Sequence, residues 1–147
     1  MNSARMLLFL AATLALTACS GAPSWLEGNW QVDHDRTQKD IDAANSNATS
    51  SQTGFGGGLL SGLNTMLGNM LLPQLAGMQI IITGKDQVTM INGQGKSESY
   101  EVVNRSSDQC TLKLKDDSVQ TYYRDGDEIY MYPTGGAHFK IYLMRQP

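Results

Sequence analysis

The chain has only two histidines and two cysteines in 147 residues, which leaves little material for metal or nucleophile chemistry. Asp33, His34 and Asp35 form a cluster of metal-ligating types, but alternation along an extended segment points His34 away from both carboxylates. His138 is the other imidazole, and this spacing does not predict a zinc site. No segment has the spacing of a phosphate-binding loop or a nucleophile elbow. We therefore expect no enzyme activity, no metal and no cofactor.

The chain also lacks an excess of positive charge, since its formal net charge is −3. A nucleic-acid-binding protein needs a basic patch, and anionic lipid headgroups attract basic segments. The composition therefore argues against a nucleic-acid partner and against electrostatic binding to membranes. The length suits a single domain with one modest core.

The N-terminal segment has the pattern of an export signal. Arg5 precedes an apolar run over residues 6–16 that is too short to span a bilayer as a helix. The run ends in Leu16, Thr17, Ala18 and Cys19, which resembles the lipobox of bacterial lipoproteins. The alternative interpretation is an ordinary cleaved signal followed by an incidental cysteine.

In the lipoproteins that this segment resembles, the cysteine is diacylated and becomes the new N-terminus. The resemblance implies a signal peptide over residues 1–18, a lipidated tether over 19–24 and a domain over 25–147. Several acyl chains on Cys19 would anchor the chain far more firmly than one myristoyl group. Ser20, where retention in the inner membrane would favour Asp, implies the periplasmic face of the outer membrane.

Cys110 is then left without an intramolecular partner. It begins an alternating segment over residues 110–115 and shares a face with Leu112 and Leu114, so we expect it in the core. The alternatives are an intermolecular disulfide or a reactive thiol, although no neighbour in sequence favours a low thiol pKa.

From residue 79 onward the apolar pattern has a period of two, which predicts β-strands. Glycine-, asparagine- and aspartate-rich turns separate the segments, so neighbouring strands are antiparallel. With a first strand near 29–32 the sequence predicts an all-β fold, a small antiparallel meander barrel of about eight strands. The predicted strands are 29–32, 79–83, 87–91, 97–103, 110–115, 119–124, 128–132 and 138–144.

Gly28, Asn29 and Trp30 at the start of this domain resemble the G-x-W signature of lipocalins and lipocalin-like barrels. In that family the tryptophan closes one end of the barrel beneath a basic residue from the last strand, and Arg145 is the candidate here. The resemblance is closest to the short lipocalin-like domains of bacterial lipoproteins, which carry helical sequence after the first strand. It implies structural roles for Gly28, Trp30 and Arg145.

An insertion over residues 36–78 separates the first two strands. Thr37 is a candidate helix N-cap, and the polar segment 45–54 predicts a flexible loop. Farther on, Leu and Met recur at helical spacing and predict an amphipathic helix that Pro73 interrupts and a turn that Gly77 ends. This apolar stripe either caps the barrel or contacts a membrane or hydrophobic ligand. Its candidate ligand-binding residues are Leu59, Leu63, Met66, Leu67, Met70 and Leu71.

Tyrosines are concentrated in the last three strands. By alternation Tyr130 and Tyr132 lie on one face of their strand, and Tyr142 lies opposite Ile141 and Leu143. These three side chains could form a partner-binding patch, or simply pack across neighbouring strands.

The sequence therefore leads to two hypotheses for a membrane-anchored lipoprotein. The first is a binding module that holds an apolar or amphiphilic small molecule. The second is a protein-interaction role, as an inhibitor, an immunity protein or an envelope-assembly accessory, with a filled barrel.

Overall fold

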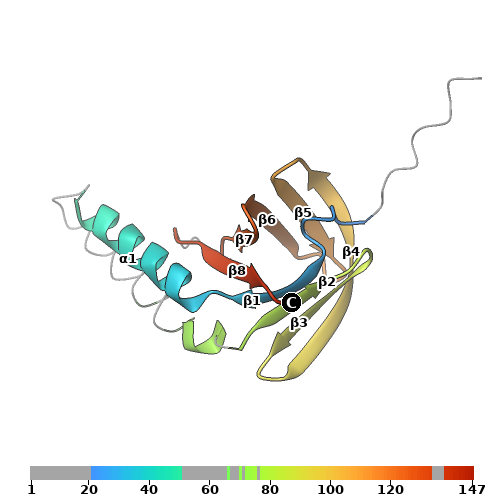
Figure 1. Cartoon of the computed structure of the whole chain (residues 1–147), viewed down its shortest axis with the longest axis horizontal. Helices are drawn as coiled ribbons and strands as arrows, with labels where there is room; N and C mark the ends of the chain where they lie inside the picture. The colour runs from blue at the N-terminus through green and yellow to red at the C-terminus, as the bar shows by residue number, and fades with distance from the viewer. Residues whose placement is uncertain (1–20, 51–65, 67–69, 71, 76, 134–137) are drawn as a thin grey trace, which may run out of the picture.

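A computed structural model describes residues 21–50, 66, 70, 72–75, 77–133 and 138–147 of the chain. These residues form a closed barrel in which each strand pairs antiparallel with the next and β1 pairs with β8 (Figure 1). The eight-stranded antiparallel meander expected from the sequence is confirmed. The strands are β1 Gly28–Val32, β2 Gln79–Ile82, β3 Asp86–Ile91, β4 Gln94–Arg105, β5 Gln109–Leu114, β6 Val119–Asp125, β7 Glu128–Met131 and β8 Ile141–Arg145.

Six strands match their predicted bounds to within one residue at each end, and two differ by more. β4 is longer at both ends than the expected 97–103 because it pairs with β3 over its first half and with β5 over its second. Its register shifts between Val102 and Asn104, at a bulge. β8 begins at Ile141 rather than 138, because its pairing with β7 begins there, opposite Met131. The Lys140 N–H donates to a helix side chain instead.

Helix α1 (His34–Ser50) follows β1 directly, which corrects two expectations. The helix begins before Thr37, and Asp33 caps it by accepting the Arg36 N–H at 2.9 Å. It also continues through the first part of the segment 45–54, which was expected to be a loop.

Side chains of α1 continue the pairing of β8 where β1 ends. Thr37 Oγ1 accepts the Tyr142 N–H at 3.0 Å, and Asp40 Oδ2 accepts the Lys140 N–H at 2.7 Å. Ile41, one turn after Thr37, is buried in the core. Thr37 is therefore a packing residue of the helix and not its cap.

The chain returns to the barrel through a helical turn over residues 72–75 that contains Pro73. Leu72 and Met78 are buried, and Gly77, with φ of 80°, reverses the chain between them. Val32 donates its N–H to the Met78 carbonyl at 3.5 Å, which places this segment beside the end of β1. The turn ended by Gly77 is thus confirmed.

We call the two ends of the barrel the closed end and the mouth. The closed end carries residues 21–27, the β2–β3, β4–β5 and β6–β7 turns and the C-terminus. The mouth carries the β3–β4 and β5–β6 turns, the start of α1 and residues 72–78. Figure 1 shows α1 on the side of the barrel opposite the first described residues, which are drawn in blue.

Candidate functional site

Arg145 and Trp30 close one end of the barrel. The Arg145 guanidinium carbon lies 4.5 Å from the Trp30 ring centroid, within cation–π distance. The same guanidinium donates to the carbonyls of Glu27 at 2.8 Å and Trp25 at 2.9 Å, while the indole N–H of Trp30 donates to the Leu26 carbonyl at 2.8 Å. The short segment before β1 is therefore fixed across the barrel end.

Gly28 is required by this arrangement. Its φ of 148° is rarely adopted by other residues, and a Cβ atom there would lie 2.5 Å from Arg145 Nη1. A glycine is thus needed at position 28 because Arg145, which covers Trp30, leaves no room there for a side chain.

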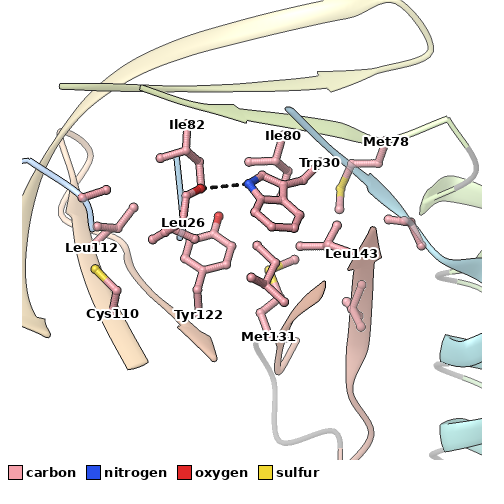
Figure 2. Close-up of a cluster of buried hydrophobic side chains, with 14 of the residues drawn as sticks. Leu26, Trp30, Met78, Ile80, Ile82, Cys110, Leu112, Tyr122, Met131 and Leu143 are labelled. Atoms are coloured by element: carbon pink, nitrogen blue, oxygen red, sulfur yellow. Dashed lines mark hydrogen bonds between the residues drawn. The ribbon is translucent and has the colours of Figure 1, made fainter. Parts of the chain in front are cut away.

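The interior next to this end is filled with side chains. Trp30 lies among Leu26, Ile80, Ile82 and Leu143, with the Tyr122 ring beside them (Figure 2). All of these residues are buried, so a ligand would have no room at this level of the barrel.

Cys110 belongs to the same core and is fully buried. Burial raises the pKa of its thiol to about 11, which leaves the nucleophilic thiolate scarce at neutral pH. The expected core position is confirmed, and a reactive thiol has no structural support.

A polar cluster adjoins this apolar layer inside the barrel. Gln87 on β3 donates from Nε2 to Gln120 Oε1 on β6 at 3.0 Å, so the two side chains meet across the barrel. The Tyr122 hydroxyl lies 3.0 Å from Gln87 Oε1 and 2.9 Å from Gln120 Oε1. Burial raises the pKa of Tyr122, which keeps its hydroxyl protonated as a donor. The polar cluster of Gln87, Gln120 and Tyr122 therefore extends across the barrel from the start of β3, near the closed end, to the start of β6, at the mouth.

A cavity of about 300 Å³ opens beside Gln120, where β6 and β7 separate. The pairing of these strands ends at Tyr123 and Tyr130, and beyond that point Gln120 Nε2 reaches the Met131 sulfur at 2.9 Å. We call this cavity the notch. Its lining residues are Leu75, Ser118, Val119, Gln120, Thr121, Met131, Tyr132, Pro133 and Ile141.

A larger hollow of about 790 Å³ lies along the β3–β4 hairpin at the mouth. Lys96 and Glu98 line it with their side chains 2.7 Å apart, and Asp116 approaches Lys96 to 3.8 Å from the next hairpin. The hydrogen bond to Glu98 raises the pKa of Lys96, so the amine stays charged at neutral pH. The mouth therefore offers ionic groups on one wall and apolar groups in the notch.

The predicted tyrosine patch exists, and it is larger than expected. Tyr130 lies 5.9 Å from Tyr132 and 5.6 Å from Tyr142 between ring centroids, and Tyr123 stacks on Tyr130 at 5.0 Å. We call Tyr123, Tyr130, Tyr132 and Tyr142 the tyrosine cluster. Tyr132 is 48% exposed, whereas Tyr142 is buried.

Two cations cover part of the tyrosine cluster. Lys140 Nζ lies 4.5 Å from the Tyr130 centroid, and the Arg36 guanidinium lies 4.0 Å from the Tyr142 centroid. Arg36 also pairs with Asp125 at 2.6 Å and with Glu128. Much of this aromatic surface is thus occupied by the protein's own side chains, as plain cross-strand packing would predict.

Some of the other expected site residues are described by the structure, and some are not. Cys19, Leu59, Leu63, Leu67 and Leu71 lie outside the described residues. Met66 and Met70 are described, and each exposes more than half of its side chain. In the described part of the chain no group of three or more His, Cys, Asp or Glu could hold a metal, and no helix is long and apolar enough to cross a membrane.

Sequence reasoning missed the polar cluster and the Lys96–Glu98 pair. A signal existed for Gln120, which stands two residues from the fully buried Tyr122. For Gln87 there was none, because hydrophobic alternation in its strand would place Val88 and Met90 inside. A polar residue on an inward face is informative, since burying it without a partner costs free energy.

Comparisons with protein-family models, with curated proteins and with solved structures find no match to this chain.

Proposed function

We propose that the chain is a bacterial lipoprotein with a lipocalin-like barrel, anchored through Cys19 at the periplasmic face of the outer membrane, and that it binds a small amphiphile at the barrel mouth. The lipobox pattern at residues 16–19 supports the anchor. The geometry of Gly28, Trp30 and Arg145 is the arrangement that the lipocalin resemblance implies.

The notch is the observation that supports a small-molecule ligand. Its volume of about 300 Å³ is at the lower end of the range for small-molecule sites. Leu75, Met131 and Ile141 supply an apolar lining, and Gln120 connects it to the polar cluster. A molecule with an apolar part and a polar group satisfies both, whereas a pure hydrocarbon would leave the amide of Gln120 against an apolar surface.

Native mass spectrometry of the Cys19→Ser domain, purified gently from periplasm, tests this function. We expect a retained adduct on the order of a few hundred daltons, the size class that such a site encloses. Leu75→Trp, which fills the notch, should release the adduct, and Val103→Trp on the exposed part of β4 is the matched control. A bare monomer, or an adduct that Leu75→Trp retains, would contradict the proposal.

The tyrosine cluster favours a second candidate, a protein-interaction role. Tyr132 is exposed beside the notch rim, and tyrosine is enriched at interfaces because its ring combines apolar area with a polar tip. Cross-linking in intact cells should then trap one defined partner that Tyr132→Ala loses. His138→Ala, also exposed in the β7–β8 connection, is the control. A monomer in every sample would count against this role.

A further inference from the structure

We propose that the closed end of the barrel faces the lipid bilayer across only a few ångströms, so that the mouth and α1 point away from the membrane. This inference rests on the acylation of Cys19 proposed above. The occupant assigned to the closed end is the lipid surface that receives the acyl chains.

The argument begins with Gly21 and Ala22, which belong to the folded domain. A Cβ atom on Gly21 would lie 2.7 Å from the Gly84 carbonyl oxygen, so the chain packs closely against the β2–β3 turn. Ala22 is buried, and its N–H donates to the Tyr100 hydroxyl at 3.2 Å. Residues 21–24, expected as part of a free tether, are therefore held by the barrel.

Tyr100 connects this segment to the sheet. Its hydroxyl donates to the Thr83 carbonyl while accepting from Ala22, so one side chain from β4 joins the N-terminal segment to the β2–β3 turn. Pro23 then turns the chain, because its carbonyl accepts the N–H groups of Leu26 and Glu27 at 2.8 and 3.2 Å. The segment continues into the Arg145 contacts described above.

The remaining tether is short. Cys19 is two residues before Gly21, and two residues reach at most about 7 Å when fully extended. If all five residues 20–24 were free of the barrel, they would reach about 17 Å. Acyl chains on Cys19 therefore insert next to the Gly21–Gly84 contact.

The mouth lies at the other end of the strands. β3 runs from Asp86, next to the anchored turn, to Ile91, about 17 Å farther along the strand. The segment that enters β2 also does so at the mouth, where Met78 accepts the Val32 N–H. The notch and the hollow thus open toward the aqueous side, where a ligand or partner would reach them.

Fluorescence quenching on the acylated full chain tests this orientation. A fluorophore is placed on single cysteines at the closed end, Lys85→Cys and Ser107→Cys, or away from it, Gln94→Cys and Lys39→Cys, all of which are exposed positions. Buried Cys110 is shielded from the label. The protein is reconstituted in phosphatidylethanolamine vesicles with some phosphatidylglycerol and a quencher-bearing headgroup.

We expect at least about twofold stronger quenching at Lys85→Cys and Ser107→Cys, because the tether holds them near the headgroups. Equal quenching at all four positions, or stronger quenching at Gln94→Cys or Lys39→Cys, would overturn the proposal. A flexible spacer of about ten residues inserted after Ser20 should remove the difference. A difference that survives the spacer would also overturn the tether as its cause.

Tyr100→Phe is the sharper variant, since it deletes only the hydroxyl that holds Ala22. It should reduce the quenching difference, whereas Tyr132→Phe on the outer face should leave it unchanged. Failure of acylation is distinguishable, because the N-terminal peptide would lack the mass of the acyl chains and the protein would not float with the vesicles. If the protein is acylated but quenching is equal at all four positions, the proposed orientation is wrong and the acylation of Cys19 still stands.

Discussion

The two ends of the barrel differ in chemistry. At the closed end Trp30 and its apolar neighbours fill the interior, and Arg145 holds the N-terminal segment over them. Farther along the barrel, Gln87, Gln120 and Glu98 put polar side chains on the inner face, and the notch and the hollow open at the mouth. We expect the filled closed end to contribute most to the stability of the fold. The mouth instead has cavities and polar side chains that folding alone does not require.

Trp30→Ala should have the largest effect on stability. Removing a fully buried aromatic side chain from a filled interior costs about 3–5 kcal/mol, from lost burial and the cavity left behind. Urea unfolding of the Cys19→Ser domain measures this, with Tyr132→Ala on the outer face as the control. A smaller loss for Trp30→Ala than for Tyr132→Ala would contradict the description of the closed end as the core.

Arg145→Ala should cost about 2 kcal/mol, because it removes a cation–π contact and two charge-assisted hydrogen bonds at a partly solvated site. It should also change the response to a second substitution. Gly28→Ala places a methyl group against Arg145 Nη1, so Gly28→Ala should be less damaging when Arg145 is already Ala. Additive free energies of unfolding in the double-mutant cycle would show that the two residues do not act together.

Cys110 gives the closed end a pH dependence. Its pKa is raised from 9.0 to about 11, so the folded state holds the thiol proton more tightly than the unfolded state. The resulting stability is fully present below pH 9 and is lost as pH rises toward 11, with a loss on the order of 2 kcal/mol. Tyr122, whose pKa is also raised, acts in the same direction at higher pH.

Urea midpoints measured between pH 8 and 11 test this linkage. Cys110→Ala should flatten the decline between about pH 9 and pH 10, since alanine does not titrate and Tyr122 contributes only above its unfolded-state pKa of 10.0. An unchanged slope in Cys110→Ala would show that Cys110 has the same pKa in both states.

The closed end was more predictable than the mouth, for a physical reason. Alternation predicts which side chains of a strand share a face, so the strands and the core position of Cys110 followed from local pattern. The pairing of Trp30 with Arg145 followed instead from the lipocalin resemblance of the segment around Trp30. The polar cluster joins β3 to β6, and no local pattern indicates that Gln87 will meet Gln120. The same holds for Tyr100, which fixes Ala22 from 78 residues away.

Gln120→Leu should have the smallest effect of this series, a loss of about 1 kcal/mol, because it leaves Gln87 and Tyr122 each short of one hydrogen-bond partner. Adding Gln87→Leu should cost less than the sum of the two single losses, since the pair is then replaced by apolar groups. If the mouth is a binding site, both single variants should also lose the adduct seen by native mass spectrometry. If the losses of stability are strictly additive and the adduct is unaffected, the polar cluster is neither a connected network nor part of a binding site. The two ends of the barrel would then differ only in how tightly their side chains pack.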